Sequence, residues 1–129
     1  MTDDDIDEVL KEKWVEVFNQ CDGKLMSKQI TDLTKSFETG QNITHILKCR
    51  GKLYFIMGRY EEALADFTKL LEFETNNAFA LRYRGETYYI MKRYEESFID
   101  LNELLKINPN NLWTLKAYEE VIRKYVYNS

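Results

Sequence analysis

Apolar side chains recur at steps of three and four residues along most of this chain, the spacing that gives an α-helix one apolar face. Two such stripes follow one another in the second half, with Leu81, Tyr88 and Met91 in the first and Phe98, Leu101, Leu104 and Leu105 in the second. Residues 93–94 separate the stripes as a short turn. The chain has one proline and five glycines, too few for a turn-rich sandwich or barrel, so the pattern predicts an all-α fold.

The same pair of stripes occurs twice, 34 residues apart. Residues 44–77 and 78–111 are identical at 15 positions, among them the paired asparagines that end each copy. An asparagine at that point can cap the helix that follows. Self-similarity at this period is typical of repeat proteins, in which each helix pair buries its apolar face against its neighbours. We therefore expect a stack of antiparallel helix pairs.

The repeated residues resemble the tetratricopeptide repeat (TPR) family. Counting residues 44, 78 and 112 as position 1 of three successive units, the resemblance rests on small residues at positions 8 and 20, tyrosines at 11 and 17 and a proline at 32. These residues are Gly51, Ala63, Tyr54 and Tyr60 in one unit, and Gly85, Ser97, Tyr88, Tyr94 and Pro109 in the next. The resemblance implies a right-handed superhelical stack, a TPR-like α-solenoid, whose first helices line a concave groove for a protein partner.

The stack is expected to contain about seven helices. Residues 1–43 are predicted to form an N-terminal helical hairpin, with helices over 6–21 and 25–37, that acts as a degenerate repeat or cap. Residues 44–77 and 78–111 are the two full units. Residues 112–129 are a partial repeat or capping helix, expected to face inward through Leu112, Leu115, Tyr118, Ile122 and Tyr125.

Three positions depart from the pattern that the family resemblance implies. They are position 4 (Leu47 and Leu81), position 7 (Arg50 and Arg84) and position 27 (Leu70 and Leu104). Because a buried arginine needs an acidic partner, we expect Arg50 to pair with Asp66 and Arg84 with Asp100. Glycine inside a helix costs about 1 kcal/mol relative to alanine. Gly51 and Gly85 therefore indicate close helix approach, with Ala63 and Ser97 expected opposite them.

Composition narrows the range of functions. The net charge is −4, which argues against nucleic acid and against a polybasic membrane anchor. The longest apolar run, residues 53–57, is far shorter than a membrane span. The chain starts without a basic and apolar leader, and Cys21 and Cys49 form no disulfide pattern, so we expect reduced thiols and a cytoplasmic location.

No catalytic constellation is apparent. His45 is the single histidine and has no spaced metal-ligand partners, and neither a nucleophile elbow nor a glycine-rich phosphate loop occurs. We therefore expect no enzyme activity, metal or cofactor, and a protein or peptide partner instead.

The residues of the implied groove favour a peptide ligand. Position 5 is a cation in all three units, and aromatic residues surround it at positions 2, 6 and 12. The predicted peptide-binding residues are Lys48, Lys52, Phe55, Phe79, Arg82, Tyr83, Glu86, Tyr89, Trp113, Lys116 and Glu120. Cations pair with carboxylates and aromatic rings bury apolar groups, so an extended, acidic peptide would suit this surface.

Other interpretations remain open. Exposed lysines and aromatic packing between units would produce the same residues without any ligand. Some family members hold chaperone C-termini in a carboxylate clamp, and here Lys48 and Lys116 match that pattern whereas Lys52, Tyr83 and Glu120 do not. The chain could instead self-associate as an assembly module, or serve as a regulatory fragment of a larger multidomain protein.

Overall fold

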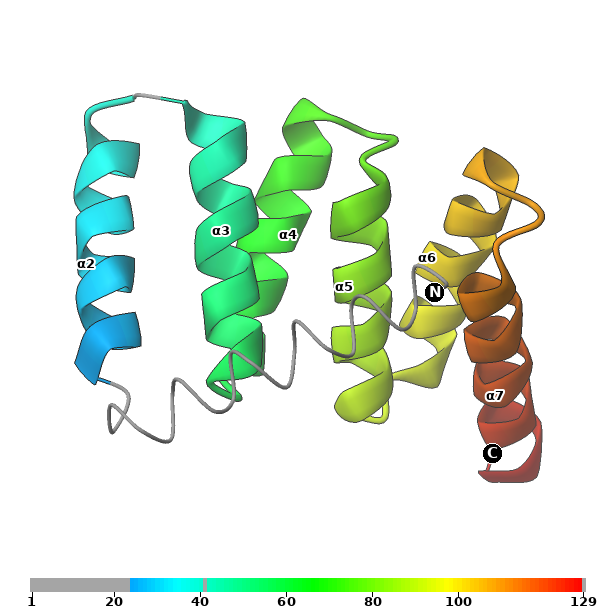
Figure 1. The fold of residues 1–129 in the computed structure, drawn as a ribbon. Coiled ribbons are helices and arrows are strands. Elements are labelled where there is room, and N and C mark those ends of the chain that lie inside the picture. Colours follow the sequence, from blue (N-terminus) through cyan, green and yellow to red (C-terminus); the bar gives the residue numbers. More distant parts are fainter. Residues whose placement is uncertain (1–23, 41, 129) are drawn as a thin grey trace.

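The computed structural model describes residues 24–40 and 42–128, and this part of the chain is helical without a strand. Its helices are α2 (Lys24–Glu38), α3 (Ile43–Ile56), α4 (Tyr60–Phe73), α5 (Ala78–Ile90), α6 (Tyr94–Ile107) and α7 (Leu112–Asn128) (Figure 1). The predicted all-α stack of helix pairs is confirmed. The helix predicted over residues 6–21 lies outside the described residues.

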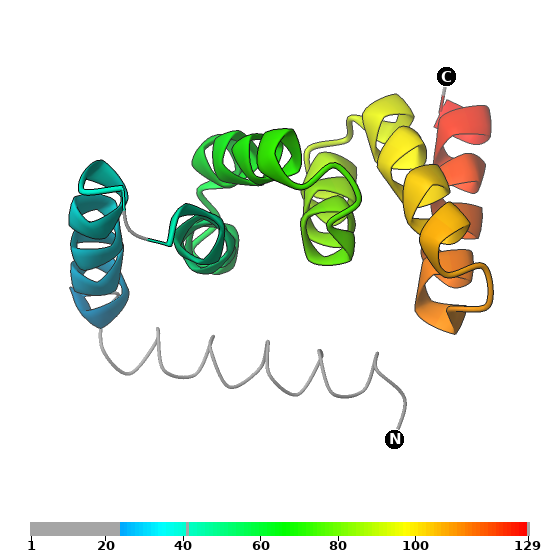
Figure 2. The ribbon, with the colours of Figure 1, turned by 90° about the horizontal axis from the view of Figure 1, so that it is seen from above.

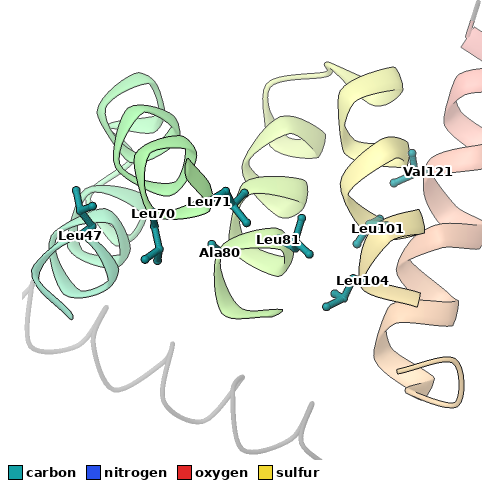
Figure 3. Close-up of a cluster of buried hydrophobic side chains, with 8 residues drawn as sticks. All are labelled: Leu47, Leu70, Leu71, Ala80, Leu81, Leu101, Leu104 and Val121. Atoms are coloured by element: carbon teal, nitrogen blue, oxygen red, sulfur yellow. The ribbon is translucent and has the colours of Figure 1, made fainter. Parts of the chain in front are cut away.

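Each helix packs mainly against the helix before it and the helix after it, and α3 also contacts α5. In Figure 2, α3 and α5 lie on one side of the stack and α4 lies on the other. A chain of buried aliphatic side chains runs through α3–α7 and joins the units (Figure 3): Leu47, Leu70, Leu71, Ala80, Leu81, Leu101, Leu104 and Val121. This continuous core makes the units depend on one another for stability.

Asparagine side chains begin two of the first helices. The Asn77 Oδ1 accepts a hydrogen bond of 2.9 Å from the backbone N–H of Ala80 at the start of α5. Asn111 accepts the equivalent bond, also 2.9 Å, from Thr114 at the start of α7. Both bonds satisfy a backbone donor that the helix itself leaves unpaired, so the predicted capping role is confirmed.

The repeated glycines mark close approach between the two helices of a unit. A Cβ atom added to Gly51 would lie 2.7 Å from the Phe67 ring, and one added to Gly85 would lie 3.4 Å from Leu101 and from the Asp100 Cβ. Phe67 and Leu101 are thus the closest neighbours of the glycines, and the expected contact between Gly85 and Ser97 is also present. Ser97 donates a 2.7 Å hydrogen bond to the Gly85 carbonyl.

Both predicted arginine–aspartate pairs are present between the helices of a unit. Arg50 donates bonds of 2.8 and 2.6 Å to Asp66. Arg84 donates bonds of 2.8 and 2.7 Å to Asp100. The hydrogen bonds to the aspartates raise the pKa of both arginines above the ordinary value, against the opposing effect of burial. Burial raises the pKa of Asp100, and Arg84 opposes that shift.

The inward face of α7 differs from the prediction. The side chains that pack on α6 are Thr114, Ala117, Tyr118 and Val121, and Val121 is only 1% exposed. Of the predicted inward residues, Tyr118 is half-buried against Phe98, Ile122 is half-buried, and Leu112, Leu115 and Tyr125 are exposed. The predicted residues are those that would face a second helix of the same unit. Among the described residues no such helix follows α7, which packs through its other face on α6 of the preceding unit.

Candidate functional site

The residues predicted to bind a peptide lie on the first helices α3, α5 and α7. We call the face that they form the groove. Because one unit spans 34 residues, a given unit position returns to the same place on each successive first helix. Nine of these residues line three hollows that follow one another along the groove: Lys48, Lys52, Phe79, Arg82, Tyr83, Trp113, Glu86, Tyr89 and Glu120.

The largest of these hollows has a volume of about 520 Å³ and lies between α2, α3 and α5. Lys48, Lys52 and Phe79 contribute to it, together with Gln29, Asp32 and Leu33 of α2. A hollow of about 230 Å³ lies among α5, α6 and α7 with Lys52 of α3 at its side, and one of about 180 Å³ lies among α5, α6 and α7. The contribution of α2 could not be predicted from the sequence, because residues 24–38 lack the repeat signature that assigns groove positions.

Cations lie over aromatic rings of the next unit at two successive steps. The Lys48 Nζ is 4.7 Å from the centre of the Phe79 ring. The Arg82 guanidinium is 4.0 Å from the centre of the Trp113 ring. Each contact joins position 5 of one unit to position 2 of the next, 31 residues along the chain. Such cation–π contacts are worth about 0.5–2 kcal/mol each, depending on exposure, and they hold the cations beside flat apolar surfaces.

Two of the predicted groove residues are buried. Phe55 and Tyr83 pack edge to face with ring centres 5.5 Å apart, and Tyr83 also lies 4.5 Å from the Phe79 ring. They form a cluster with Phe67 and Ala63 between the units. These side chains expose little surface, and their main effect is to support the ring of Phe79, which is half-buried beside the hollows.

The groove carries negative charge near the far end of α5. The Tyr89 hydroxyl donates a 3.3 Å hydrogen bond to Glu120, which also forms an ion pair with Arg123 on its own helix. Burial and the adjacent Glu120 carboxylate raise the pKa of Tyr89. Glu120 is therefore engaged by two neighbours. Lys116, one turn before it, is exposed.

The described residues contain no group of three histidine, cysteine, aspartate or glutamate side chains that could hold a metal ion. His45 and Cys49 lie one turn apart on α3, with Nε2 and Sγ separated by 3.6 Å. Over residues 24–40 and 42–128, no helix combines the length and the apolar character needed to cross a membrane.

Comparison with known proteins identifies relatives of the fold. The family model described as "Tetratricopeptide repeat" matches residues 45–77 and again residues 78–111. No curated protein sequence matches the chain at a significant level.

Several solved structures resemble the whole stack. One is the first TPR of Spaghetti (RPAP3) bound to the HSP90 peptide SRMEEVD, with 15% identity, a TM-score of 0.72 and coverage of 92% of this chain and 94% of that one. The first TPR domain of human RPAP3 has 19% identity, a TM-score of 0.72 and coverage of 92% and 91%. The TPR domain of Arabidopsis OM64 has 22% identity, a TM-score of 0.69 and coverage of 91% and 94%. At these identities the likeness concerns the fold.

Proposed function

This chain belongs to the tetratricopeptide repeat family, whose repeat pattern matches just over half of it, and we propose that it is a non-catalytic protein–protein interaction module. The groove of α3, α5 and α7 binds an extended peptide segment with acidic side chains. Catalysis has no part in this proposal, because the predicted groove residues are cations, aromatic rings and two glutamates.

The observation that carries the proposal is the alternation of cations and aromatic rings along the groove. Lys48 over Phe79 and Arg82 over Trp113 create two neighbouring places where a cation and a ring face can be contacted together. A carboxylate can pair with the cation, and an adjacent apolar group can lie against the ring. Because the two places come from successive units, a ligand that uses both must extend across the stack.

The distribution of charge along the groove favours one orientation of the bound peptide. Two cations, Lys48 and Lys52, and one acid, Asp32, line the hollow beside α2. Glu86 and Glu120 line the hollow between α5 and α7. We therefore propose that the most acidic part of the peptide lies toward α2, where the cations are concentrated.

The carboxylate-clamp interpretation is less favoured. The RPAP3 repeat is bound to an HSP90 peptide that ends in an acidic sequence, SRMEEVD, and that statement concerns RPAP3. In this chain Glu120 stands where the clamp pattern has a cation, and it is already bonded to Tyr89 and Arg123. A carboxylate brought to that point would meet a like charge, so acidic side chains near Lys48 are preferred over a clamped C-terminus.

The test is a titration of fluorescent acidic peptides against the wild-type protein and against Arg82→Glu and Lys48→Glu variants. Each reversal replaces an attraction by a repulsion, so we expect affinity to fall by about tenfold or more at low salt, and the difference from the wild-type protein to shrink at high salt, which screens both interactions. Lys69→Glu on α4 is the matched control, because this exposed lysine lies outside the groove. Circular dichroism verifies that the variants fold.

Equal affinity of the wild-type protein and both groove variants would contradict the proposal. Equal weakening by the Lys69 control would also contradict it, since the effect would then reflect net charge rather than the groove.

A further inference from the structure

The side of α7 that faces away from α6, which we call its outer face, is exposed. The equivalent side of the earlier first helices, α3 and α5, is buried. In α5, positions 4 and 8 are Leu81 and Gly85, which are buried against the unit's own second helix, α6. In α3 the same positions, Leu47 and Gly51, are buried against α4. The equivalent residues of α7 are Leu115 and Glu119, and both are exposed.

An apolar stripe runs the length of this outer face. Leu81 in α5 is 4% exposed, whereas its counterpart Leu115 is 37% exposed and Leu112, one turn earlier, is 53% exposed. Ile122 continues the stripe one turn beyond Glu119, and the exposed Val126 follows it. Among the described helices, the one that packs closely on α7 is α6, and it meets the opposite side through Val121. α7 is thus apolar on two faces.

Glu119 restricts what can cover this stripe. At the same position, Gly51 and Gly85 allow the second helix of the unit to approach closely. A glutamate side chain there prevents such an approach and adds a negative charge within the stripe. A helix that docks on this face must therefore lie farther away and place a cation opposite Glu119.

We propose that the occupant is the α7 helix of a second copy of this chain, packed antiparallel to the first across a two-fold axis. Leu115 then meets the Val126 end of the partner stripe, and Ile122 lies near the middle. Glu119 lies within the stripe, and Arg123 lies one turn beyond it at the edge of the stripe. With Leu115 opposite the Val126 end of the other copy, Glu119 of each copy lies beside Ile122 and Arg123 of the other.

A parallel arrangement is disfavoured by the same charges, because it would bring the two Glu119 side chains together. Arg123 is 64% exposed beside its own Glu120, so its charge is accessible at the surface. The face is that of a single helix, less than the roughly 800 Å² that each partner buries in a standard interface. We therefore expect weak association, with a dissociation constant on the order of 100 μM.

The experiment is sedimentation equilibrium of the wild-type protein and of Glu119→Lys, Arg123→Glu and the double charge-swap variant. Each single variant creates like-charge contacts across the two-fold axis, and we expect dimerisation to weaken about tenfold. The double variant restores opposite charges and should regain wild-type dimerisation. Leu115→Asp tests the apolar stripe, and it should abolish the dimer while circular dichroism shows an intact fold.

Glu72→Lys on α4, where the glutamate side chain is 60% exposed, is the matched control and should leave the dimer unchanged. A wild-type protein that stays monomeric at high micromolar concentration would overturn the proposal and leave this face to a helix of another protein. Failure of the double variant to recover would refute the antiparallel arrangement. Peptide binding is tested separately by Lys48→Glu, which changes the groove without touching this stripe.

Discussion

Replacing Arg84 by leucine is expected to destabilise the protein strongly, because it removes the partner of a buried carboxylate. The Asp100 side chain is only 2% exposed, and Arg84 donates two hydrogen bonds to its carboxylate. Arg84 also donates a 3.3 Å bond to Thr68 on α4, so the pair connects the two units. Leucine fills part of the vacated space but offers Asp100 no donor.

Breaking a buried ion pair from one side costs about 3–5 kcal/mol. For a chain of this size each kcal/mol lowers the midpoint of thermal unfolding by about 4 °C, so a decrease of roughly 12–20 °C is expected. Replacing both residues, as in Arg84→Leu with Asp100→Ala, removes the unpaired charge and should recover most of the loss. Lys106→Leu, which removes a surface ion pair with Glu103, should cost less than about 1 kcal/mol.

The assay is thermal and urea unfolding followed by circular dichroism for the four proteins. In Arg84→Leu, burial without the arginine keeps the pKa of Asp100 above its value in the unfolded chain. The folded protein then binds a proton more readily than the unfolded chain does, so the deficit should shrink as the pH falls from about 7 to about 4. An Arg84→Leu variant no less stable than the Lys106 control, or a deficit independent of pH, would refute the reasoning.

Two further predictions use differences between the repeats. Gly51→Ala should be destabilising because the new Cβ would lie 2.7 Å from the Phe67 ring, whereas Gly85→Ala should be tolerated because its nearest contacts are at 3.4 Å. The midpoints of urea unfolding compare the two variants. Equal midpoints would contradict the difference in helix approach. Lys92 has a φ of 63°, at the position where Gly58 has 77°. Lys92→Gly should therefore stabilise the protein by about 1 kcal/mol, and calorimetry showing no rise in the unfolding midpoint would count against this strain.

Much of the candidate site could be predicted from sequence because the 34-residue period carries a residue's place from one unit to the next. That logic placed Lys48 and Arg82 on successive first helices, and it also predicted the Arg50–Asp66 and Arg84–Asp100 pairs. It missed the stacking of each cation on the aromatic ring of the next unit, because that contact depends on the distance between α3, α5 and α7. It also missed the α2 side of the largest hollow, where no repeat pattern exists.

The sequence by itself determined the helices, their pairing within units and the residues that recur along the groove. These features depend on local periodicity and on a repeat that occurs twice in the chain. The tertiary structure decided which face of each helix is covered. Helix α7 illustrates the difference, since its sequence offers two apolar faces and its own periodicity cannot choose between them. Burial is a property of the neighbours of a helix. With α6 on one side and no described second helix on the other, Val121 is buried and Leu115 is exposed.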